Sequence, residues 1–423
     1  MNPNYVGEKQ AIDLIKGFNN PDIEQKVLLP NEEKGTNPVV ILAEKHTEEI
    51  ECIAVFPGGK YFVSVGDDYT IKVFNSDGTL FTSIKNEHKD VISSVVVMND
   101  FKFATCSWDK SIKVWKMKGK TFICECTRTF ELDKTFTTTG EGKDEEKEDE
   151  KEIYEAVLDN TMNDFQQILF YEFWDKKEDK VNNNDDNLKK DAFVTASLTA
   201  FHHINPITLY SIGYDQTSGI SAQGNIKFPK VSTIDKVDEI GSTHDDKIQS
   251  IFKFNENTVI SSGLDKKLKI WTIQNNTLLF TRDEKDNKNI KFDVIDDVEP
   301  AYYQGGIVKI DANRIIVGSE RKIQIINVSS KNKTNKFVND KAYNMLLLNS
   351  GLLLVTDQTE NIRLYTSENL NKICDIHPKE PKIEENEEKK EEKLETEGYQ
   401  CIVQLKDGSI ITSNHGTIKI WSF

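Results

Sequence analysis

Apolar and polar residues alternate in short runs along most of the chain. One run places Ile50, Cys52, Ala54 and Phe56 at every second position, and a similar run begins at Ile248. Each is followed by a turn rich in Gly, Asn or Asp and then by another short apolar run. Alternation with a period of two, in segments bounded by turn residues, is typical of β-strands. The pattern therefore predicts an all-β chain made of many short strands.

One sequence motif, called the turn phrase below, recurs within this pattern. Residues 64–74 contain a small hydroxyl residue, a turn with Asp, and an alternating apolar strand that ends in an aromatic residue. Residues 105–115 and 261–271 repeat the same order of residue types. Recurrence of one unit along a chain indicates a repeat architecture, in which each unit packs against its neighbours. We therefore expect one radial array of small sheets, with binding as its function.

A histidine precedes the turn Asp of each copy at a nearly constant distance. The separations are 22, 21 and 21 residues for the pairs His46–Asp68, His88–Asp109 and His244–Asp265. The extra residue in the first copy fits the turn Pro57-Gly58-Gly59. This nearly constant spacing makes the histidine part of the repeating unit.

On these residues the sequence resembles the WD-repeat β-propeller family. The resemblance implies that a loop His, a strand Ser or Thr, a turn Asp and a strand-end Trp form a hydrogen-bonded polar set in each blade. The matching positions are His46, Ser64 and Asp68, then His88, Thr105, Asp109 and Trp115, then His244, Ser261, Asp265 and Trp271. Phe74 stands in place of the first Trp and cannot donate a hydrogen bond.

Three weaker copies of the phrase occupy residues 314–326, 352–365 and 409–421. They lack the loop His and the aligned turn Asp, so we expect the polar set to be absent there. The last copy ends after a third strand, and we expect Val39–Glu44 to pair with it as the fourth. That pairing would join the first blade to the last and remove an exposed sheet edge.

With one blade assigned to the middle of the chain, the sequence predicts a seven-bladed β-propeller of four-stranded antiparallel blades, closed by an N-terminal strand. An eighth blade is the alternative. Two registers fit the middle: either Tyr210–Thr217 carries the turn phrase, or Asp191–Ser197 corresponds to Phe101–Ser107. The segment Asp164–Trp174 fits a strand or a short helix in both registers.

The domain limits follow from the same pattern. We expect residues 1–36 to form an N-terminal extension with a short amphipathic helix over Glu8–Phe18, and residues 37–423 to form the propeller. Insertions at about 133–190 and 379–397 are acidic and are expected to be disordered surface loops. The net charge of −16 makes nucleic acid and membrane surfaces unfavourable partners, because both need a basic face. Without a secretory signal, we expect a cytoplasmic protein, with the nucleus or the cytoskeleton as alternatives.

The sequence offers little for chemistry. It contains no fingerprint for a nucleophile, a metal or a dinucleotide, so we expect no cofactor, no metal, no small-molecule substrate and no enzymatic activity. The six cysteines are expected to be reduced. The resemblance to the family also implies partner contacts just before each turn Asp, at Asp67, Trp108 and Leu264. The alternative for Trp108 is that its ring packs on its own blade.

These observations favour a protein-binding scaffold or adaptor subunit of a larger complex. A substrate-recognition module of a ubiquitin ligase, or of a similar regulatory complex, is the first alternative. A propeller enzyme or small-ligand-binding protein is the second.

Overall fold

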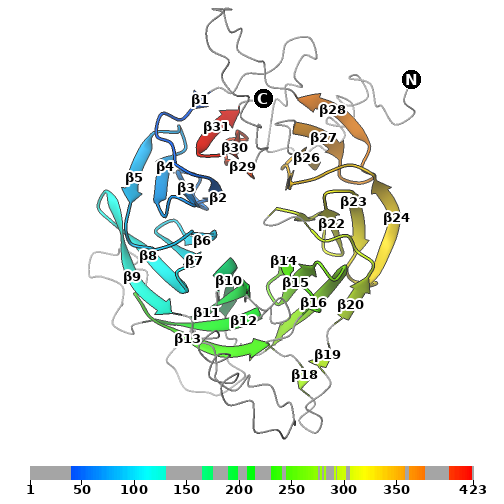
Figure 1. Cartoon of the computed structure of the whole chain (residues 1–423), viewed down its shortest axis with the longest axis horizontal. Coiled ribbons are helices and arrows are strands. Elements are labelled where there is room, and N and C mark those ends of the chain that lie inside the picture. The colour runs from blue at the N-terminus through cyan, green and yellow to red at the C-terminus, as the bar shows by residue number, and fades with distance from the viewer. Residues whose placement is uncertain are drawn as a thin grey trace, which may run out of the picture.

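The strands of this chain stand in a ring of small sheets around a central axis (Figure 1). The computed structural model describes residues 40–129, 164–174, 189–198, 207–214, 230–240, 244–274, 277–278, 281–282, 290–291, 293–301, 305–357, 362–376 and 400–421. All regular structure in these ranges is β-strand. Accordingly, these ranges contain no helix that is long and apolar enough to cross a membrane.

Within the described residues the sheets form seven four-stranded antiparallel blades of a β-propeller, as the sequence predicts. Blade 1 contains β2 (Ile50–Val55), β3 (Tyr61–Gly66), β4 (Ile71–Asn75) and β5 (Leu80–Ile84). Blade 2 contains β6 (Ser94–Asn99), β7 (Lys102–Ser107), β8 (Ser111–Lys118) and β9 (Thr121–Thr129). Blade 3 contains β10 (Asp164–Trp174), β11 (Lys189–Leu198), β12 (Ile207–Tyr214) and β13 (Val231–Ile240).

Blade 4 contains β14 (Ile248–Asn255), β15 (Thr258–Gly263), β16 (Lys267–Gln274) and β20 (Asp293–Asp296). The short β17 (Thr277–Leu278) also pairs with the end of β16, and β18 (Thr281–Arg282) pairs with β19 (Ile290–Lys291). Blade 5 contains β21 (Ile307–Lys309), β22 (Arg314–Gly318), β23 (Ile323–Asn327) and β24 (Asn332–Val338). Blade 6 contains β25 (Asn344–Leu347), β26 (Leu352–Thr356), β27 (Ile362–Thr366) and β28 (Lys372–Ile376). Blade 7 contains β29 (Cys401–Gln404), β30 (Ile410–Asn414), β31 (Thr417–Trp421) and β1 (Val40–Ile41).

The second strands of blades 1, 2 and 6 are the most deeply buried. Every residue of β3 and β7 is buried, whereas β2 alternates between buried and half-buried positions. A strand in the middle of a blade has a neighbouring blade on both faces, so it carries a continuous apolar run. The core therefore lies between the blades. Phe56 of blade 1, for example, packs edge-on against Phe103 of blade 2, with ring centroids 6.1 Å apart.

The N-terminal strand closes the ring. Val40 pairs with Ile420, Ile41 pairs with Lys419, and the Leu42 amide donates a hydrogen bond to the Ile418 carbonyl at 3.1 Å. Leu42 is buried in the cluster of apolar side chains between blades 7 and 1. The predicted pairing is thus confirmed, and β1 supplies the fourth strand of the last blade.

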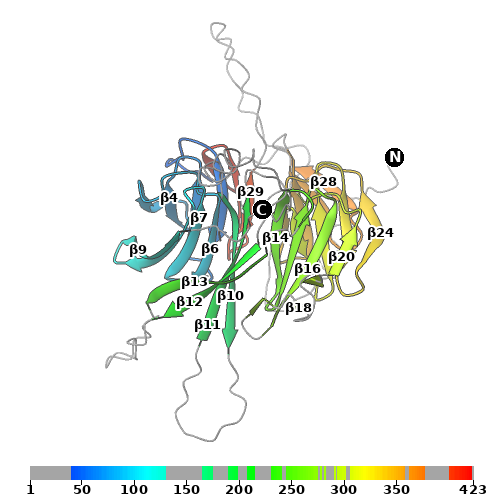
Figure 2. The same ribbon diagram turned by 60° about the horizontal axis from the view of Figure 1, so that its bottom comes forward.

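Blade 3 settles the question of register. Asp191–Ser197 lies in β11, the second strand, as Phe101–Ser107 largely does in blade 2. The register that began the turn phrase at Tyr210 is wrong, because Tyr210 lies inside the third strand and pairs with Phe193. Asp164–Trp174 is a strand, so this part of the insertion predicted over 133–190 belongs to the propeller. Figure 2 shows blade 3 between blades 2 and 4.

Residues 133–163 and 175–188 of that insertion, the insertion at 379–397 and the predicted helix at Glu8–Phe18 lie outside the described residues, whereas residues 189 and 190 begin β11.

Candidate functional site

The polar set of blade 2 is a chain of hydrogen bonds. Trp115 Nε1 donates to Thr105 Oγ1 at 2.9 Å, and the Thr105 hydroxyl lies 2.8 Å from His88 Nε2. Since that hydroxyl accepts from Trp115, it can donate to His88, which leaves the ring proton of His88 on Nδ1. His88 Nδ1 lies 2.8 Å from Asp109 Oδ2 and donates to it. The set therefore joins the loop before the blade to the turn within it.

Blade 4 has the same geometry. Trp271 Nε1 donates to Ser261 Oγ at 2.8 Å, and the two ring nitrogens of His244 lie 2.7 Å from Ser261 Oγ and 2.9 Å from Asp265 Oδ1. The structure thus brings together the residues that the repeat spacing placed in one set.

In blade 1 the set is shorter. His46 lies 2.8 Å from Ser64 Oγ and 2.9 Å from Asp68 Oδ1. Phe74 instead stacks on Phe62, with ring centroids 5.1 Å apart, so the Ser64 hydroxyl receives no Trp donor.

The weaker blades keep other polar contacts. In blade 7, Trp421 Nε1 donates to Thr412 Oγ1 at 2.8 Å, so half of a set is present where we expected none. In blade 6, Arg363 forms ion pairs with Asp340 and Asp357, and the Tyr365 hydroxyl donates to Asp340. An Arg–Asp pair there ties the loop before the blade to its third strand, a role that sequence comparison with the His–Asp copies does not reveal.

The titration of the polar sets fits a structural role. Burial raises the pKa of Asp109, but hydrogen bonds from His88, Ser111 and the Lys89 amide outweigh it and hold the pKa well below its ordinary value. Asp68 and Asp265 are shifted in the same direction. Burial lowers the pKa of His244. The folded state therefore holds ionised carboxylates beside a histidine that resists gaining a proton.

These shifts predict a protein that loses stability in acid. The stabilisation from Asp109 is complete above the unfolded pKa of about 3.9 and is lost as the pH falls through the lower folded value. His244 adds to the loss, because below about 6.5 the unfolded state binds its proton more readily than the folded state does. Urea unfolding should show stability falling as the pH drops below about 4, where the carboxylates of the polar sets gain protons in the unfolded state; between about pH 7 and 4 the raised pKa of Glu51 opposes the contribution of His244. A free energy of unfolding that does not change with pH below about 4 would contradict the structural role of the polar sets.

The three predicted binding positions are equivalent in the blades. The amides of Asp67, Trp108 and Leu264 each donate at 2.9 Å to the carbonyl of a residue just before the first strand, which is Glu49, Val91 or Lys247 respectively. We call the end of the propeller that carries turns 67–70, 108–111 and 264–267 the turn face. Trp108 is 37% exposed there and Leu264 is 40% exposed. Asp67 is half-buried, and Tyr69, two residues later, is exposed.

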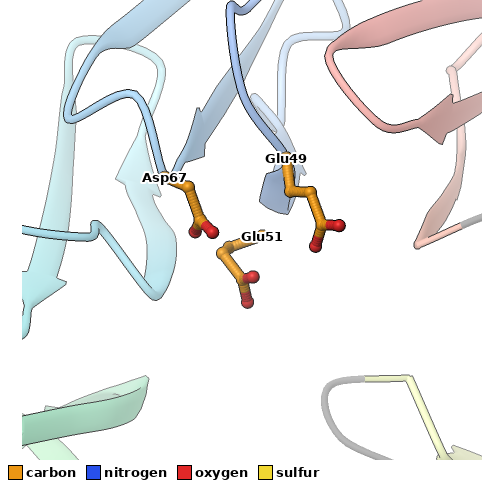
Figure 3. Close-up of side chains that lie close together, drawn as sticks. All are labelled: Glu49, Glu51 and Asp67. Carbon is orange, nitrogen blue, oxygen red and sulfur yellow. The ribbon is translucent and has the colours of Figure 1, made fainter.

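At the inner edge of blade 1 three carboxylates converge. Glu49, Glu51 and Asp67 bring one oxygen each within 4.8 Å of one another (Figure 3). Glu51 is the extra residue of a β-bulge, since Ile50 pairs with Gly66 and Cys52 with Val65. A β-bulge changes the direction in which a side chain points, and this one brings the Glu51 side chain next to the turn that carries Asp67.

Gly66 permits the close approach of the turn to the first strand. A Cβ at residue 66 would lie 1.9 Å from the Glu49 carbonyl oxygen. A residue with a side chain would therefore push the Asp67 turn away from Glu49.

The converging carboxylates repel one another. Burial, the charges of Asp67 and Glu49 and a hydrogen bond with Asp67 together raise the pKa of Glu51 to about 7. Burial also raises the pKa of Asp67. The charges that face Asp67 and act in the same direction belong to Glu48, Asp68 and Asp90. Among the described residues these three carboxylates are the one group with the geometry to hold a cation, and carboxylate oxygens suit hard cations or ammonium and guanidinium groups.

The repeat itself does not require these acids. Aligned through the amide bonds of the turn, the positions of Glu49, Glu51 and Asp67 correspond to Val91, Ser93 and Trp108 in blade 2 and to Lys247, Gln249 and Leu264 in blade 4. Both blades fold with other residues there. Sequence reasoning selected Asp67 alone and missed Glu49 and Glu51. Comparison of the aligned copies could have identified them, because blade 1 has acids where blades 2 and 4 have other residues.

Comparison with known proteins agrees with this geometry. The family model described as WD domain, G-beta repeat matches residues 37–75, 78–116 and 238–272. Lissencephaly-1 homolog 1 of Paramecium tetraurelia is 30% identical over 109 residues, which are 26% of this chain and 26% of that protein. The match thus spans about a quarter of that relative's length.

A structural match covers nearly the whole chain. The WD40 β-propeller domain of Doa1 superposes with a TM-score of 0.52 over 92% of this chain and 97% of that one, at 12% sequence identity. Identity this low shows the fold alone. With complete polar sets in blades 2 and 4 and a partial one in blade 1, the chain is a seven-bladed β-propeller in which the three matched segments are similar to WD repeats.

Proposed function

We propose that this chain is a non-enzymatic scaffold or adaptor subunit that binds protein partners through its turn face. The observation that carries the proposal is the exposure of Trp108 and Leu264 at equivalent turn positions of two blades. Tyr69 adds a third large exposed side chain on the same face. Exposed apolar groups gathered on one face are typical of interaction sites, and aromatic anchors are frequent in protein interfaces.

The histidines of the blades support a non-enzymatic role. His46, His88 and His244 are buried, and both ring nitrogens of each are engaged with a carboxylate and a hydroxyl. A general acid or base must reach the proton that it transfers. These histidines could reach a substrate only if their blades opened. We therefore assign them a structural role, in which they stabilise the fold.

Charge supports protein rather than nucleic acid as the partner. The net charge of −16 would repel a phosphate backbone, and the carboxylates at the inner edge of blade 1 extend this repulsion to the turn face. We place the protein in the cytoplasm, within a larger assembly, where a rigid ring can present several sites at once.

Cross-linking of the tagged full chain with its co-purified partners tests the proposal. Lysines of the turn face, such as Lys89 and Lys110, should form cross-links to partners. Lys60 and Lys406 serve as controls, because they lie in the turns between the first and second strands, at the opposite end of the antiparallel blades. Partner cross-links confined to Lys60 and Lys406 would contradict the proposal.

A further inference from the structure

We infer that the rim of the turn face between blades 4 and 5 binds an acidic segment of a protein partner, whose Asp or Glu side chains meet Arg321 and Lys322 beside the exposed ring of Phe337. The inference rests on the proposed function and names the chemistry of the partner. Residues 307–341, from the first strand of blade 5 to the loop after its last strand, contain eight Lys or Arg and three Asp or Glu. Their formal charge is thus +5 in a chain whose net charge is −16.

Three lysines gather around one carboxylate where the outer strands of blades 4 and 5 meet. Lys333 of β24 places its Nζ 2.8 Å from Oδ2 of Asp297, the residue directly after β20, and both strands lie on the outside of the ring (Figure 1). The hydrogen bond and the charge of Lys333 lower the pKa of Asp297. The charges of Lys266, in the turn of blade 4, and Lys322, in the turn of blade 5, act in the same direction. Lys266 also pairs with Glu299 at 3.5 Å, so three cations share two carboxylates.

An aromatic ring holds one of these lysines in place. Lys322 Nζ lies 4.3 Å from the centroid of the Phe337 ring, and Phe337 is 47% exposed. Within the described part of the chain, neither Lys322 nor the exposed Arg321 forms an ion pair. An ammonium group that rests on a ring face keeps N–H donors directed away from the ring. Lys322 and Arg321 therefore offer donors to a carboxylate from outside.

The turn that carries both cations belongs to the turn face. Ser319–Lys322 joins the second strand, β22, to the third strand, β23, the same connection that carries Leu264 in blade 4. The Ala342 amide donates to the carbonyl at the start of this turn at 2.8 Å, so the loop with the exposed Lys341 lies against it. Blade 4 is the neighbour of blade 5 in the ring. A partner that contacts Leu264 therefore needs to cross one blade interface to reach the cations.

Charge selects the kind of ligand. The cations of this rim are Lys266, Arg321, Lys322, Lys333 and Lys341, and its acids are Asp297, Glu299 and Glu320; the neighbouring Asp340 is paired with Arg363. The field of the whole chain repels an acidic peptide, which therefore binds only where cations outnumber acids locally. Lysines on an outer strand also discourage pairing between sheet edges, but Arg321 and Lys322 lie in a turn, which has no such edge. A carboxylate would accept charge-assisted hydrogen bonds from these two residues, and an apolar residue beside it would pack on Phe337.

A peptide-binding assay on the full chain tests the inference. The probe is fluorescein-labelled hexa-glutamate, with a labelled Gly-Ser hexapeptide as the uncharged control, measured by anisotropy at about 0.15 M salt. The site variant Arg321→Gln/Lys322→Gln removes two cations from the turn of blade 5. The matched variant Lys118→Gln/Lys120→Gln removes two exposed cations where β8 meets β9, at the opposite end of blade 2. Because both variants have the same net charge, a difference between them reports a local site.

We expect the site variant to bind hexa-glutamate about tenfold more weakly than wild type and the matched variant to stay within about twofold. Phe337→Ala should weaken binding by about threefold, because Lys322 loses the ring on which it rests. Equal losses in the two double variants would overturn the inference, because the general field would then account for binding. A wild-type protein that fails to bind the probe at about 1 mM would overturn it as well.

Removal of the central carboxylate tests the inference in the opposite direction. Asp297→Asn deprives Lys333, Lys266 and Lys322 of that counter-charge, and asparagine tolerates the positive φ of 56° found there. Hexa-glutamate should therefore bind about fivefold more tightly. Asp77→Asn removes an exposed carboxylate from the turn between β4 and β5 and should leave the affinity within about twofold of wild type. An equal gain in both variants would contradict the assignment to this rim.

A nucleic-acid probe and partner recovery complete the test. If a labelled single-stranded RNA dodecamer binds more tightly than hexa-glutamate, and Arg321→Gln/Lys322→Gln abolishes that binding, the rim is a nucleic-acid site and the inference falls. If cellular partners are lost from Trp108→Ala but fully retained by Arg321→Gln/Lys322→Gln, the proposed function stands and this inference fails. Partner loss from both variants, with the matched variant unaffected, supports both.

Discussion

Replacing Glu125 with alanine is expected to lower the free energy of unfolding by about 3–5 kcal/mol, because it would remove a buried carboxylate that pairs with the buried ammonium group of Lys102. Lys102 Nζ lies 2.5 Å from Glu125 Oε2, and the two side chains are 1% and 4% exposed. The same carboxylate oxygen accepts a hydrogen bond of 3.1 Å from the Val231 amide at the start of the outer strand of blade 3. One carboxylate thus closes an ion pair inside blade 2 and links that blade to the next.

Urea unfolding of three variants measures this effect. Glu125→Ala and Lys102→Ala should each be strongly destabilised, whereas Lys102→Met/Glu125→Leu should recover most of the loss, because it removes both charges and keeps the volume. A loss below about 1 kcal/mol for Glu125→Ala would show that water or another cation replaces the pair.

The second large effect concerns the polar set of blade 2. Asp109→Ala should cost more than about 2 kcal/mol, since it removes the carboxylate acceptor of the buried His88 Nδ1 proton and leaves only the Ser111 hydroxyl, at 3.3 Å, to replace it. The Lys89 amide, which donates to Asp109 at 3.0 Å, would lose its partner too.

Blade 1 provides the matched comparison. Asp68→Ala should cost less, because Phe74 already leaves the set of His46 and Ser64 without a Trp donor. Denaturant melts of the two variants check this order. Equal losses of unfolding free energy would mean that the hydrogen bond from Trp115 to Thr105 does not strengthen the set in blade 2.

The sequence predicted the fold wherever the spacing of the repeat was regular. The constant separation of His88 and Asp109, repeated at His244 and Asp265, reflects a fixed distance along two strands and a turn, so it identified blades 2 and 4. The closing strand was also predictable, because an apolar run before His46 had no other edge to pair with. In blade 3, long polar segments separate β10, β11 and β12, so no spacing fixed the register.

Part of the candidate site was predictable for the same reason. Position in the repeat pointed to Asp67, Trp108 and Leu264, which the structure places at one end of the blades. Glu49 and Glu51 were missed because alternating acids at the start of a strand are typical of ordinary solvent-facing positions. Their convergence depends on the β-bulge at Glu51 and on the missing side chain of Gly66, which only the pairing of β2 with β3 reveals.

The measurement that tests the binding account most directly compares two exposed aromatic residues of blade 2. Trp108→Ala removes an aromatic side chain from the turn face, and Phe101→Ala removes one, 44% exposed, from the turn at the opposite end of the same blade. Partner recovery and melting temperature are measured on the same preparation of each full-length variant. We predict that Trp108→Ala loses at least one partner while its melting temperature stays within about 2 °C of wild type, and that Phe101→Ala keeps all partners. Retention of every partner by Trp108→Ala, or their loss only together with the fold, would contradict the account.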